Sequence, residues 1–306
     1  MSFEVTTAFR KEYSDSFLIA YQQMESKLRS AVRIETQNSE EKFWDFIGRT
    51  TAIKNRPRGS KTQHISTPHT RRRCTLNSYT WSDTTSSLDV IQMMKDPNSD
   101  YLKVGVAALM RGMDEEILAA AGGTAYTKKE GDTAMTMTND CYKINSDGTV
   151  AAPGVAFTDT TQTGLTIEKM AKIGELMDEQ SVPDSERYII CNPYQKWLLL
   201  QDTKVGSVDY NNVKALWQGE VNTFMNFTFI FLPTERFTYN ATDTAAIECY
   251  AWQRDSMLLS MGKDVTTKVD NLPDENYDVQ AFAEAFYGSV RLRGEGVIPI
   301  NLLPTA

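Results

Sequence analysis

Apolar residues near the N-terminus recur at steps of three and four, the spacing of one face of a helix. They are Tyr13, Phe17, Tyr21, Met24, Leu28 and Val32, and they predict an amphipathic helix over residues 13–32. The residues that follow, 35–42, are polar and offer this face no partner nearby in the sequence. We therefore expect the helix to pack on a distant part of the chain or on another chain. The candidate contact residues are Phe17, Tyr21, Met24 and Leu28.

A longer helix is predicted over residues 97–121. Pro97 suits the first helical position, where its missing amide hydrogen costs nothing, and Gly122-Gly123 is typical of a helix end. One face is apolar and carries Leu102, Val106, Leu109, Met113 and Ile117. At ~1.5 Å per residue the helix would be about 38 Å long, well beyond the usual ~11 to 12 residues.

Residues 160–258 combine a helix pattern with several short apolar runs. The helix predicted over 166–179 has one apolar face, formed by Ile167, Met170, Ile173 and Met177. Buried strands are predicted at 188–191, 227–232 and 246–252, and Asn192-Pro193 begins a short helix that runs to residue 200. We expect this block to fold as a domain of its own.

The pattern beyond residue 277 is compatible with a strand or a helix. Alternate residues are apolar from Tyr277 to Tyr287, while Val279, Phe282 and Phe286 would also fit a helical face. Beyond Gly288 the alternation resumes one position out of step, which a glycine bulge would produce. We favour the strand.

Residues 48–83 are rich in Thr, Ser, Arg and Pro and poor in apolar side chains. The sequence Pro57-Arg-Gly-Ser60 is typical of a turn, and β-favouring residues at 70–81 predict a returning strand. These features predict a long hairpin within residues 41–85. Its middle has too little apolar surface for a core of its own, so we expect it to lie on something else.

Charge is distributed unevenly along the chain of 306 residues, which contains 40 acidic and 32 basic residues. Between Asp45 and Asp83 there is no acid, and eight cations lie there: Arg49, Lys54, Arg56, Arg58, Lys61, Arg71, Arg72 and Arg73. The remaining 24 basic residues face 40 acidic ones, so the rest of the chain carries a formal charge of −16. A basic arm is thus attached to an acidic body, and any binding to nucleic acid must be local.

Three interpretations of the basic arm are open. The arm of one subunit could lie on the acidic body of the next, where complementary charge fixes the register. Exposed ion pairs contribute only ~0 to 1 kcal/mol each, so they would specify this contact more than stabilise it. The arm could also bind nucleic acid. Apart from His64 and His69, however, no aromatic residue lies among the cations from Arg49 to Arg73 to stack on bases. A solvated loop is the third interpretation, and we favour the first.

The sequence predicts no catalytic, metal or cofactor site. Both histidines lie in the basic arm, so the packed domains lack the usual general base. His64, His69 and Cys74 match no ligand spacing of a metal site, and phosphate-binding and nucleophile motifs are missing from the sequence. The acidic runs at 114–116 and 274–275 are expected to be solvated faces.

Cysteine spacing argues against zinc ribbons, redox motifs and a disulfide framework, and hydropathy argues against a membrane protein. The chain has no Cys-x-x-Cys pair, so we expect reduced and mostly buried thiols at Cys74, Cys141, Cys191 and Cys249. No stretch approaches the ~20 apolar residues of a membrane span, and no membrane partner is expected.

Six stretches resemble one branch of the major capsid proteins of tailed bacteriophages. They are Leu76-Asn-Ser-Tyr-Thr-Trp81-Ser-Asp83, Asp96-Pro-Asn-Ser-Asp-Tyr101, Ala119-Ala-Ala-Gly-Gly-Thr-Ala125, Asp209-Tyr-Asn-Asn-Val-Lys-Ala-Leu216, Gly219-Glu-Val-Asn-Thr-Phe224-Met-Asn-Phe227 and Tyr287-Gly-Ser-Val-Arg-Leu292. The order of parts is also similar: an N-terminal arm, an extended hairpin, a long helix, a compact α/β block and long returning strands.

The resemblance implies an α+β protein with the Hong Kong phage capsid fold. The implied parts are an N-terminal arm (1–40), an extended loop (41–85), a peripheral domain (86–159, with the spine helix at 97–121), an axial domain (160–258) and the returning strands of the peripheral domain (259–306). The basic arm would then be the loop that lies across a neighbouring subunit in this family. Lys54 and Lys61 lie in the segment that is cross-linked in part of the family, but no acceptor is recognisable and cross-linking is not predicted.

The resemblance also implies a function without catalysis or a cofactor. The chain would be a major capsid protein that assembles with itself, as hexamers and pentamers, into the icosahedral head shell around double-stranded DNA. The other implied partners are a separate scaffolding protein, a portal and a decoration protein, and assembly would take place in the host bacterial cytoplasm before the protein resides in the virion capsid. Two alternatives stay open: an encapsulin-type compartment that encloses proteins, and a nucleic-acid-binding protein that uses the basic arm.

Overall fold

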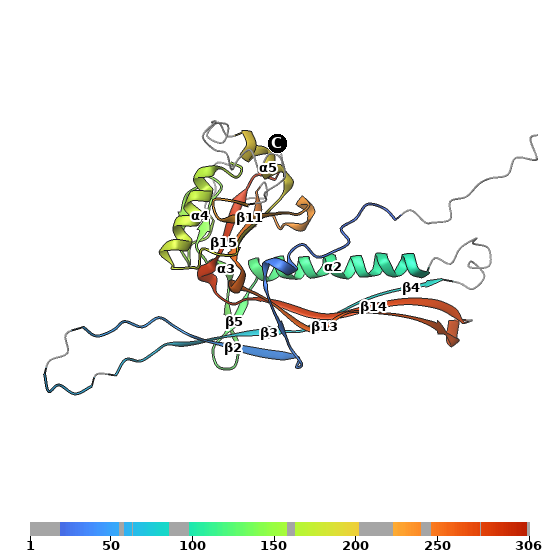
Figure 1. The fold of residues 1–306 in the computed structure, drawn as a ribbon, viewed down its shortest axis with the longest axis horizontal. Coiled ribbons are helices and arrows are strands. Elements are labelled where there is room, and N and C mark those ends of the chain that lie inside the picture. The colour runs from blue at the N-terminus through green and yellow to red at the C-terminus, as the bar shows by residue number, and fades with distance from the viewer. Residues whose placement is uncertain are drawn as a thin grey trace, which may run out of the picture. The chain divides into compact units, whose positions relative to one another are not determined.

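A computed structural model describes residues 19–54, 58–62, 64–85, 98–157, 163–201, 223–239, 246–275 and 277–304 (Figure 1). The chain divides into two compact units. Unit 1 comprises Met1–Glu25, Ser78–Gly112 and Val265–Ala285, and unit 2 comprises Ser26–Asn77, Met113–Asp264 and Phe286–Ala306. Short 3-10 turns occur at η2 (Arg29–Ala31), η3 (Thr234–Arg236), η4 (Arg254–Ser256), η5 (Pro273–Glu275) and η6 (Gly294–Gly296).

The core of unit 2 is a mixed seven-stranded sheet. In sheet order its strands are β10 (Thr223–Phe224), β11 (Phe227–Phe231), β9 (Arg187–Cys191), β12 (Ile247–Gln253), β15 (Val297–Leu302), β7 (Lys143–Ile144) and β8 (Val150–Ala151). β9 is parallel to β11 and antiparallel to β12. The central strands are buried along almost their whole length, which explains why they appear in the sequence as continuous apolar runs. The strands predicted at 188–191, 227–232 and 246–252 are thereby confirmed.

Three helices accompany this sheet. They are α3 (Met137–Asp140), α4 (Ile167–Glu179) and α5 (Pro193–Gln201), and the predictions for α4 and α5 are confirmed. Thr166 caps α4, because its side chain accepts a hydrogen bond from the Lys169 amide. The buried face of α4 packs on the sheet beside β11, where Gly174 faces the ring of Phe227 (Figure 1).

A second sheet of unit 2 contains the predicted hairpin. Its strands, in sheet order, are β2 (Glu41–Ile47), β3 (His69–Thr75), β5 (Ala125–Thr127) and β6 (Thr133–Met135). β2 and β3 are antiparallel and pair from Glu41 opposite Thr75 to Ile47 opposite His69. Residues 48–68 connect them and are called the extended loop below.

The third sheet has the strand order β1-β13-β14-β4, with bounds β1 (Arg33–Thr36), β13 (Met257–Leu272), β14 (Asp278–Arg291) and β4 (Asn77–Thr85). β14 confirms the strand predicted beyond residue 277. Its buried positions alternate up to Tyr287 and slip by one at Gly288. A side chain at Gly288 would overlap the carbonyl of Thr75, so the close approach of that backbone requires glycine here.

The long helix is α2 (Asn98–Gly122), which confirms the prediction over 97–121, although Pro97 itself lies outside the described residues. In unit 1, Gly105 of α2 lies against the indole of Trp81, leaving no room for a side chain. Arg111 donates hydrogen bonds to the side chain of Gln22 and the carbonyl of Gln23. The hydrogen bonds of Arg111 hold the segment around Gln22 and Gln23 on α2, and the contact with Gly105 places Trp81 of β4 against the same helix.

The helix predicted over residues 13–32 is wrong from residue 19 onward. The described residues 19–28 are not helical, and only the 3-10 turn η2 follows. The carboxylate of Asp114 accepts hydrogen bonds from the hydroxyl of Ser26 and from the amides of Lys27 and Leu28. Backbone donors that a helix would use internally are thus taken by a residue of α2.

Two boundaries also differ from the prediction. Residues 297–302 were expected among the returning strands at 259–306, but β15 pairs with β12 in the seven-stranded sheet. All six of its residues are buried, because a central strand is covered on both faces. The single returning strand predicted at 70–81 is in fact two strands, β3 and β4. They separate at Leu76, whose amide donates a hydrogen bond to the carbonyl of Glu40.

Candidate functional site

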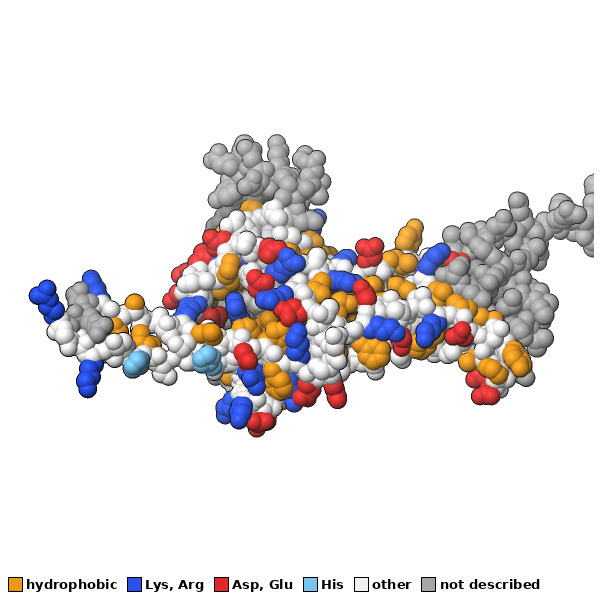
Figure 2. Space-filling view, turned by 60° about the horizontal axis from the view of Figure 1, so that its bottom comes forward, with side chains coloured by type: hydrophobic (Ala, Val, Ile, Leu, Met, Phe, Trp, Pro, Cys, Tyr) orange, Lys and Arg blue, Asp and Glu red, His pale blue; other side chains and the backbone are white. Residues whose placement is uncertain are grey.

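The extended loop and the two strands that carry it form the candidate site. Figure 1 shows the loop continuing outward from β2 and β3 of unit 2. Its described residues are exposed at nearly every position. In Figure 2 Lys and Arg side chains project from this loop. His64 belongs to the loop, and His69 is the first residue of β3.

Two of the arginines predicted to contact a neighbour pair across the hairpin instead. Arg71 donates two hydrogen bonds to Asp45, at 2.5 and 3.2 Å, and lies over the ring of Phe43. The hydrogen bond from Arg71 lowers the pKa of Asp45, and the positive charge of the guanidinium adds to this effect. Arg73 forms an ion pair with Glu41 at 3.0 Å and lies over the ring of Tyr126. Both residues hold the base of the loop together within one chain.

Arg72 points to the opposite side of β3 and is nearly buried, with 9% of the residue exposed. Its Nη2 lies 2.7 Å from Oδ1 of Asp140. The other oxygen of Asp140 accepts a hydrogen bond from Nε of Arg291 at 2.9 Å. Arg291 is fully buried and also donates to the carbonyls of Ala121, Gly123 and Met135. This cluster joins β3, α3, β14 and the end of α2.

Arg49, at the start of the loop, also has partners in its own chain. Its guanidinium donates to the carbonyl of Gln180 and lies 3.3 Å from the carboxylate of Glu295. Both side chains of this ion pair are more than half exposed. The contact ties the loop to the turn that follows α4.

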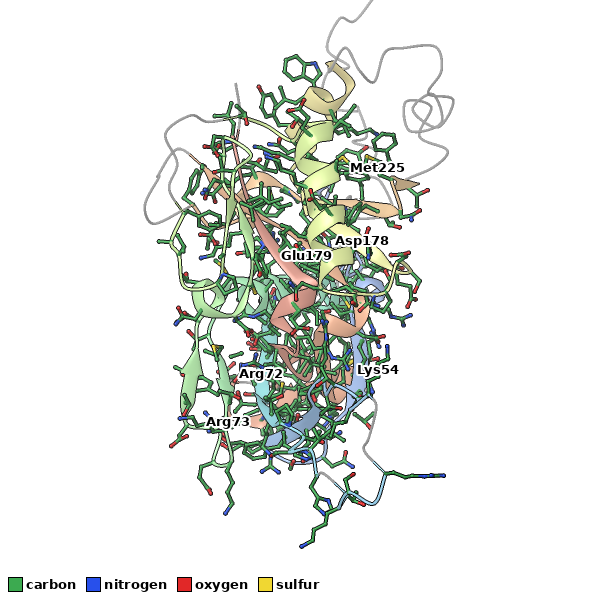
Figure 3. All side chains as sticks on the ribbon, turned by 90° about the vertical axis from the view of Figure 1, so that its left-hand side faces the viewer. Lys54, Arg72, Arg73, Asp178, Glu179 and Met225 are labelled. Carbon is green, nitrogen blue, oxygen red and sulfur yellow. The ribbon has the colours of Figure 1, made fainter. Side chains whose placement is uncertain are left out.

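The remaining cations lie toward the far end of the loop. Lys54, Arg58 and Lys61 are exposed, and none of them has an ion-pair partner among the described residues. Arg56 lies outside the described residues. Figure 3, viewed from the side of the loop, shows Lys54 on the loop and Arg72 and Arg73 on the strand behind it. Of the seven predicted interface cations that the structure describes, these three keep their charge available to another molecule.

The predicted residues of the N-terminal arm fall into three groups. Phe17 lies outside the described residues. Tyr21 is fully exposed and Met24 is 43% exposed, so both are accessible for contact. Leu28 is completely buried in unit 2. Its assignment as an intersubunit contact is therefore corrected to a core residue.

Sequence reasoning missed the two carboxylates that fix these segments, Asp140 and Asp114. Asp114 belongs to an acidic run that was expected to be solvated, yet only 2% of it is exposed. No periodicity marks either residue, because the contacts are distant in sequence. The partners of Asp140 lie 68 and 151 positions away, and those of Asp114 lie 86 to 88 positions away.

No group of His, Cys, Asp and Glu side chains among the described residues could hold a metal ion. Across the same residues, no helix has the length and apolar character needed to cross a bilayer. All four cysteines are buried and free, as expected.

Comparison with known proteins identifies the family. A family model of phage capsid proteins matches residues 5–303, nearly the whole chain. This chain belongs to the phage capsid protein family. A search of curated protein sequences found no match.

Solved capsid structures have the same fold. The chain is similar to the capsid of cyanophage P-SCSP1u, with 16% identity, a TM-score of 0.72 and coverage of 97% of this chain and 93% of that one. Cyanophage Pam1 gives 11% identity, a TM-score of 0.73 and coverage of 100% and 99%. Helicobacter pylori bacteriophage KHP30 gives 10% identity, a TM-score of 0.71 and coverage of 99% of both chains.

The predicted Hong Kong phage capsid fold is thereby confirmed. The family and the fold identify the chain as a major capsid protein of a tailed-phage head. It therefore resides in the virion capsid, and its copies build an icosahedral shell. The family match favours this function over the encapsulin alternative.

Proposed function

We propose that the shell built by this capsid protein encloses double-stranded DNA, and that the extended loop of each subunit lies across a neighbouring copy. Lys54, Arg58 and Lys61 would contact the neighbour in this arrangement. Arg49, Arg71, Arg72 and Arg73 would instead hold the base of the loop in position, because their partners lie in the same chain.

The observation that carries the proposal is the exposed apolar surface of the loop and of the strand end that precedes it. Ile53 and Ile65 of the loop are 50% and 46% exposed, and Ile47 at the end of β2 is 73% exposed. Burying an isoleucine side chain contributes roughly 1.5 to 3 kcal/mol, several times the ~0 to 1 kcal/mol of an exposed ion pair. The isoleucines would therefore supply most of the stability of the contact, and the cations would determine its register.

The acidic body supports the choice of partner. Outside the segment between Asp45 and Asp83 the chain has a formal charge of −16, so a neighbouring copy offers the complementary potential that steers a cationic loop. A container with an acidic body also binds packaged DNA weakly, which suits later release.

Further partners and the place of assembly follow from the family. We propose a scaffolding protein, a portal and a decoration protein as partners, assembly in the host bacterial cytoplasm, and a purely structural role without catalysis. Membership in a phage capsid family supports each of these.

The test is reversal of the three exposed loop cations, Lys54→Glu, Arg58→Glu and Lys61→Glu, in one variant. Electron microscopy and sedimentation of the purified protein should show closed shells for the wild type and at least about tenfold fewer for the variant, because favourable contacts become repulsive. The melting temperature of the unassembled chain should not change, since these side chains have no ion-pair partner among the described residues.

The matched control carries glutamine at the same three positions. It removes attraction without adding repulsion, and its shell yield should lie between the other two. Normal shells from the glutamate variant would contradict the role proposed for the loop. A wild-type protein that forms no shells, alone or with a scaffolding protein, would contradict the proposal as a whole.

A further inference from the structure

A pocket of about 560 Å³ lies in unit 2 at the base of the extended loop. It is called the root pocket here. Residues 46–49 and Thr70 and Arg72 form one wall, residues 180–183 after α4 form another, and residues 292–296 after β14 complete it. A volume of this size accommodates a side chain together with the backbone that carries it.

The wall of the root pocket contains a buried charge that no described residue balances. Arg72 and Arg291 are two guanidinium groups, 9% and 0% exposed, and both bind the single carboxylate of Asp140. No other carboxylate among the described residues lies within ion-pair distance of either group. One buried positive charge is therefore left over.

The two arginines differ in how far their donors are used. Arg291 directs its remaining donors to three backbone carbonyls. Arg72 uses Nε for the carbonyl of Leu292 and Nη2 for Asp140, while its Nη1 is buried without a partner among the described residues. A buried donor without a partner costs ~1 to 3 kcal/mol, or more on a charged group. Nη1 itself is closed to solvent, and Arg72 lines the root pocket with the 11% of its side chain that is exposed.

Other side chains at the root pocket add positive charge. Arg293 lines it and lies over the ring of Phe46 at 5.5 Å, and among the described residues it has no ion pair. Arg49 lines it as well, but Glu295 offsets that charge. The chemical group that suits such a site is a carboxylate, which can accept hydrogen bonds from two guanidinium groups at once.

We propose that the root pocket receives an aspartate or glutamate side chain of a neighbouring copy of this chain. The inference rests on the proposed function, because it requires neighbours packed against the loop. With 40 acidic and 32 basic residues, each neighbour offers more carboxylates than cations. Seating one of them would complete the charge balance of Arg72 only in the assembled shell, so the site links assembly to the rigidity of the loop base.

The test supplies the missing carboxylate from the chain itself. Thr70 is exposed, lines the root pocket and lies two positions before Arg72 on β3, so its side chain is on the same side of the strand. Thr70→Glu should therefore place a carboxylate near Arg72, and Thr70→Gln is the neutral control of equal size.

Two readouts are expected to move in opposite directions. The melting temperature of the unassembled protein should be at least about 2 °C higher for Thr70→Glu than for Thr70→Gln, because only the first balances the buried charge. The shell yield should be at least about tenfold lower for Thr70→Glu, because the neighbour's carboxylate now meets an occupied site.

Equal melting temperatures of the two variants would overturn the site itself. A stabilised Thr70→Glu variant that assembles as well as Thr70→Gln would overturn the neighbour as its source. In that case a higher melting temperature in acetate than in chloride, at equal ionic strength, would identify a free carboxylate as the ligand. Each of these results leaves the loop proposal intact, since that proposal is tested by the wild-type shells and the loop-cation variant.

Discussion

Asp140 is the residue on which three segments of unit 2 depend. Its two oxygens bind Arg72 and Arg291 at 2.7 and 2.9 Å, and Arg291 in turn binds the carbonyls at the end of α2. A cation at this position also interacts favourably with the negative end of the helix dipole. The side chains of Asp140 and Arg72 are each only 11% exposed, so solvent screens this pair weakly.

We predict that Asp140→Asn lowers the free energy of unfolding by roughly 3 kcal/mol or more, because it leaves two buried guanidinium groups without a carboxylate. Urea unfolding of the unassembled protein measures this loss. The matched control is Asp184→Asn, whose side chain is 75% exposed and whose partner Arg187 keeps Asp178. The control should cost less than about 1 kcal/mol. Equal losses would show that Asp140 has no special role.

For single residues, prediction from the sequence was correct for the cysteines and failed for the arginines of β3. The four thiols were expected to be buried, and they are; burial raises the pKa of Cys74 to about 12, so the thiol stays protonated. The role of Arg71, Arg72 and Arg73 was not foreseen. Their partners come from β2, from α3 and from Leu292 just after β14, and no spacing along the chain predicts those contacts.

At the scale of elements, periodicity identified most helices and strands. α2, α4, β9 and β14 lie where their patterns predict, because each buries one face or both. The pattern failed at residues 19–32, where the apolar spacing of a helix occurs in an irregular segment that ends in the 3-10 turn η2. There the hydrogen bonds to Asp114 outweigh local helix propensity, which is a weak preference.

The turn between β10 and β11 contains an unusual residue for its backbone. Met225 and Asn226 both have positive φ, 51° and 64°, as in the tight hairpin turns that favour asparagine and glycine. Figure 3 shows Met225 at this turn, and it is 43% exposed. Methionine in the left-handed region costs about 1 kcal/mol, with little burial to offset it.

We predict that Met225→Asn raises the free energy of unfolding by about 0.5 to 1 kcal/mol, because asparagine adopts the left-handed region more readily. Met225→Ala is the control, since it removes the same side chain and keeps the strained backbone. Thermal and urea unfolding of both variants measure the difference. If the alanine variant gained as much, the strain would not be the cause.

At the scale of the whole molecule, the cations are divided between two tasks. Arg49, Arg71, Arg72 and Arg73 fasten the loop to its own chain, whereas Lys54, Arg58 and Lys61 are exposed. This division weakens the alternative of a nucleic-acid-binding arm, because only the second group is free to contact phosphates.

We predict that any binding of the unassembled protein to duplex DNA depends weakly on salt. Three exposed cations, or four with Arg56, give a slope of log K against log salt of no more than about 4, at ~0.9 per phosphate contact. A fluorescence anisotropy titration over a range of salt concentrations measures it. A slope near 7 would mean that all eight cations engage DNA, and would restore the binding alternative.

The sequence by itself determined the elements, the polar hairpin, the basic arm on an acidic body and, through ordered short stretches, the capsid family. These features are local or additive, so they can be recognised without knowing which segments meet. Only the tertiary structure decided that β15 joins the seven-stranded sheet, that Leu28 is a core residue, and that Asp140 shares its carboxylate between two buried arginines. Each of these is a contact between segments far apart in the chain, and its free energy depends on burial and on the exact set of partners, which the order of residues does not reveal.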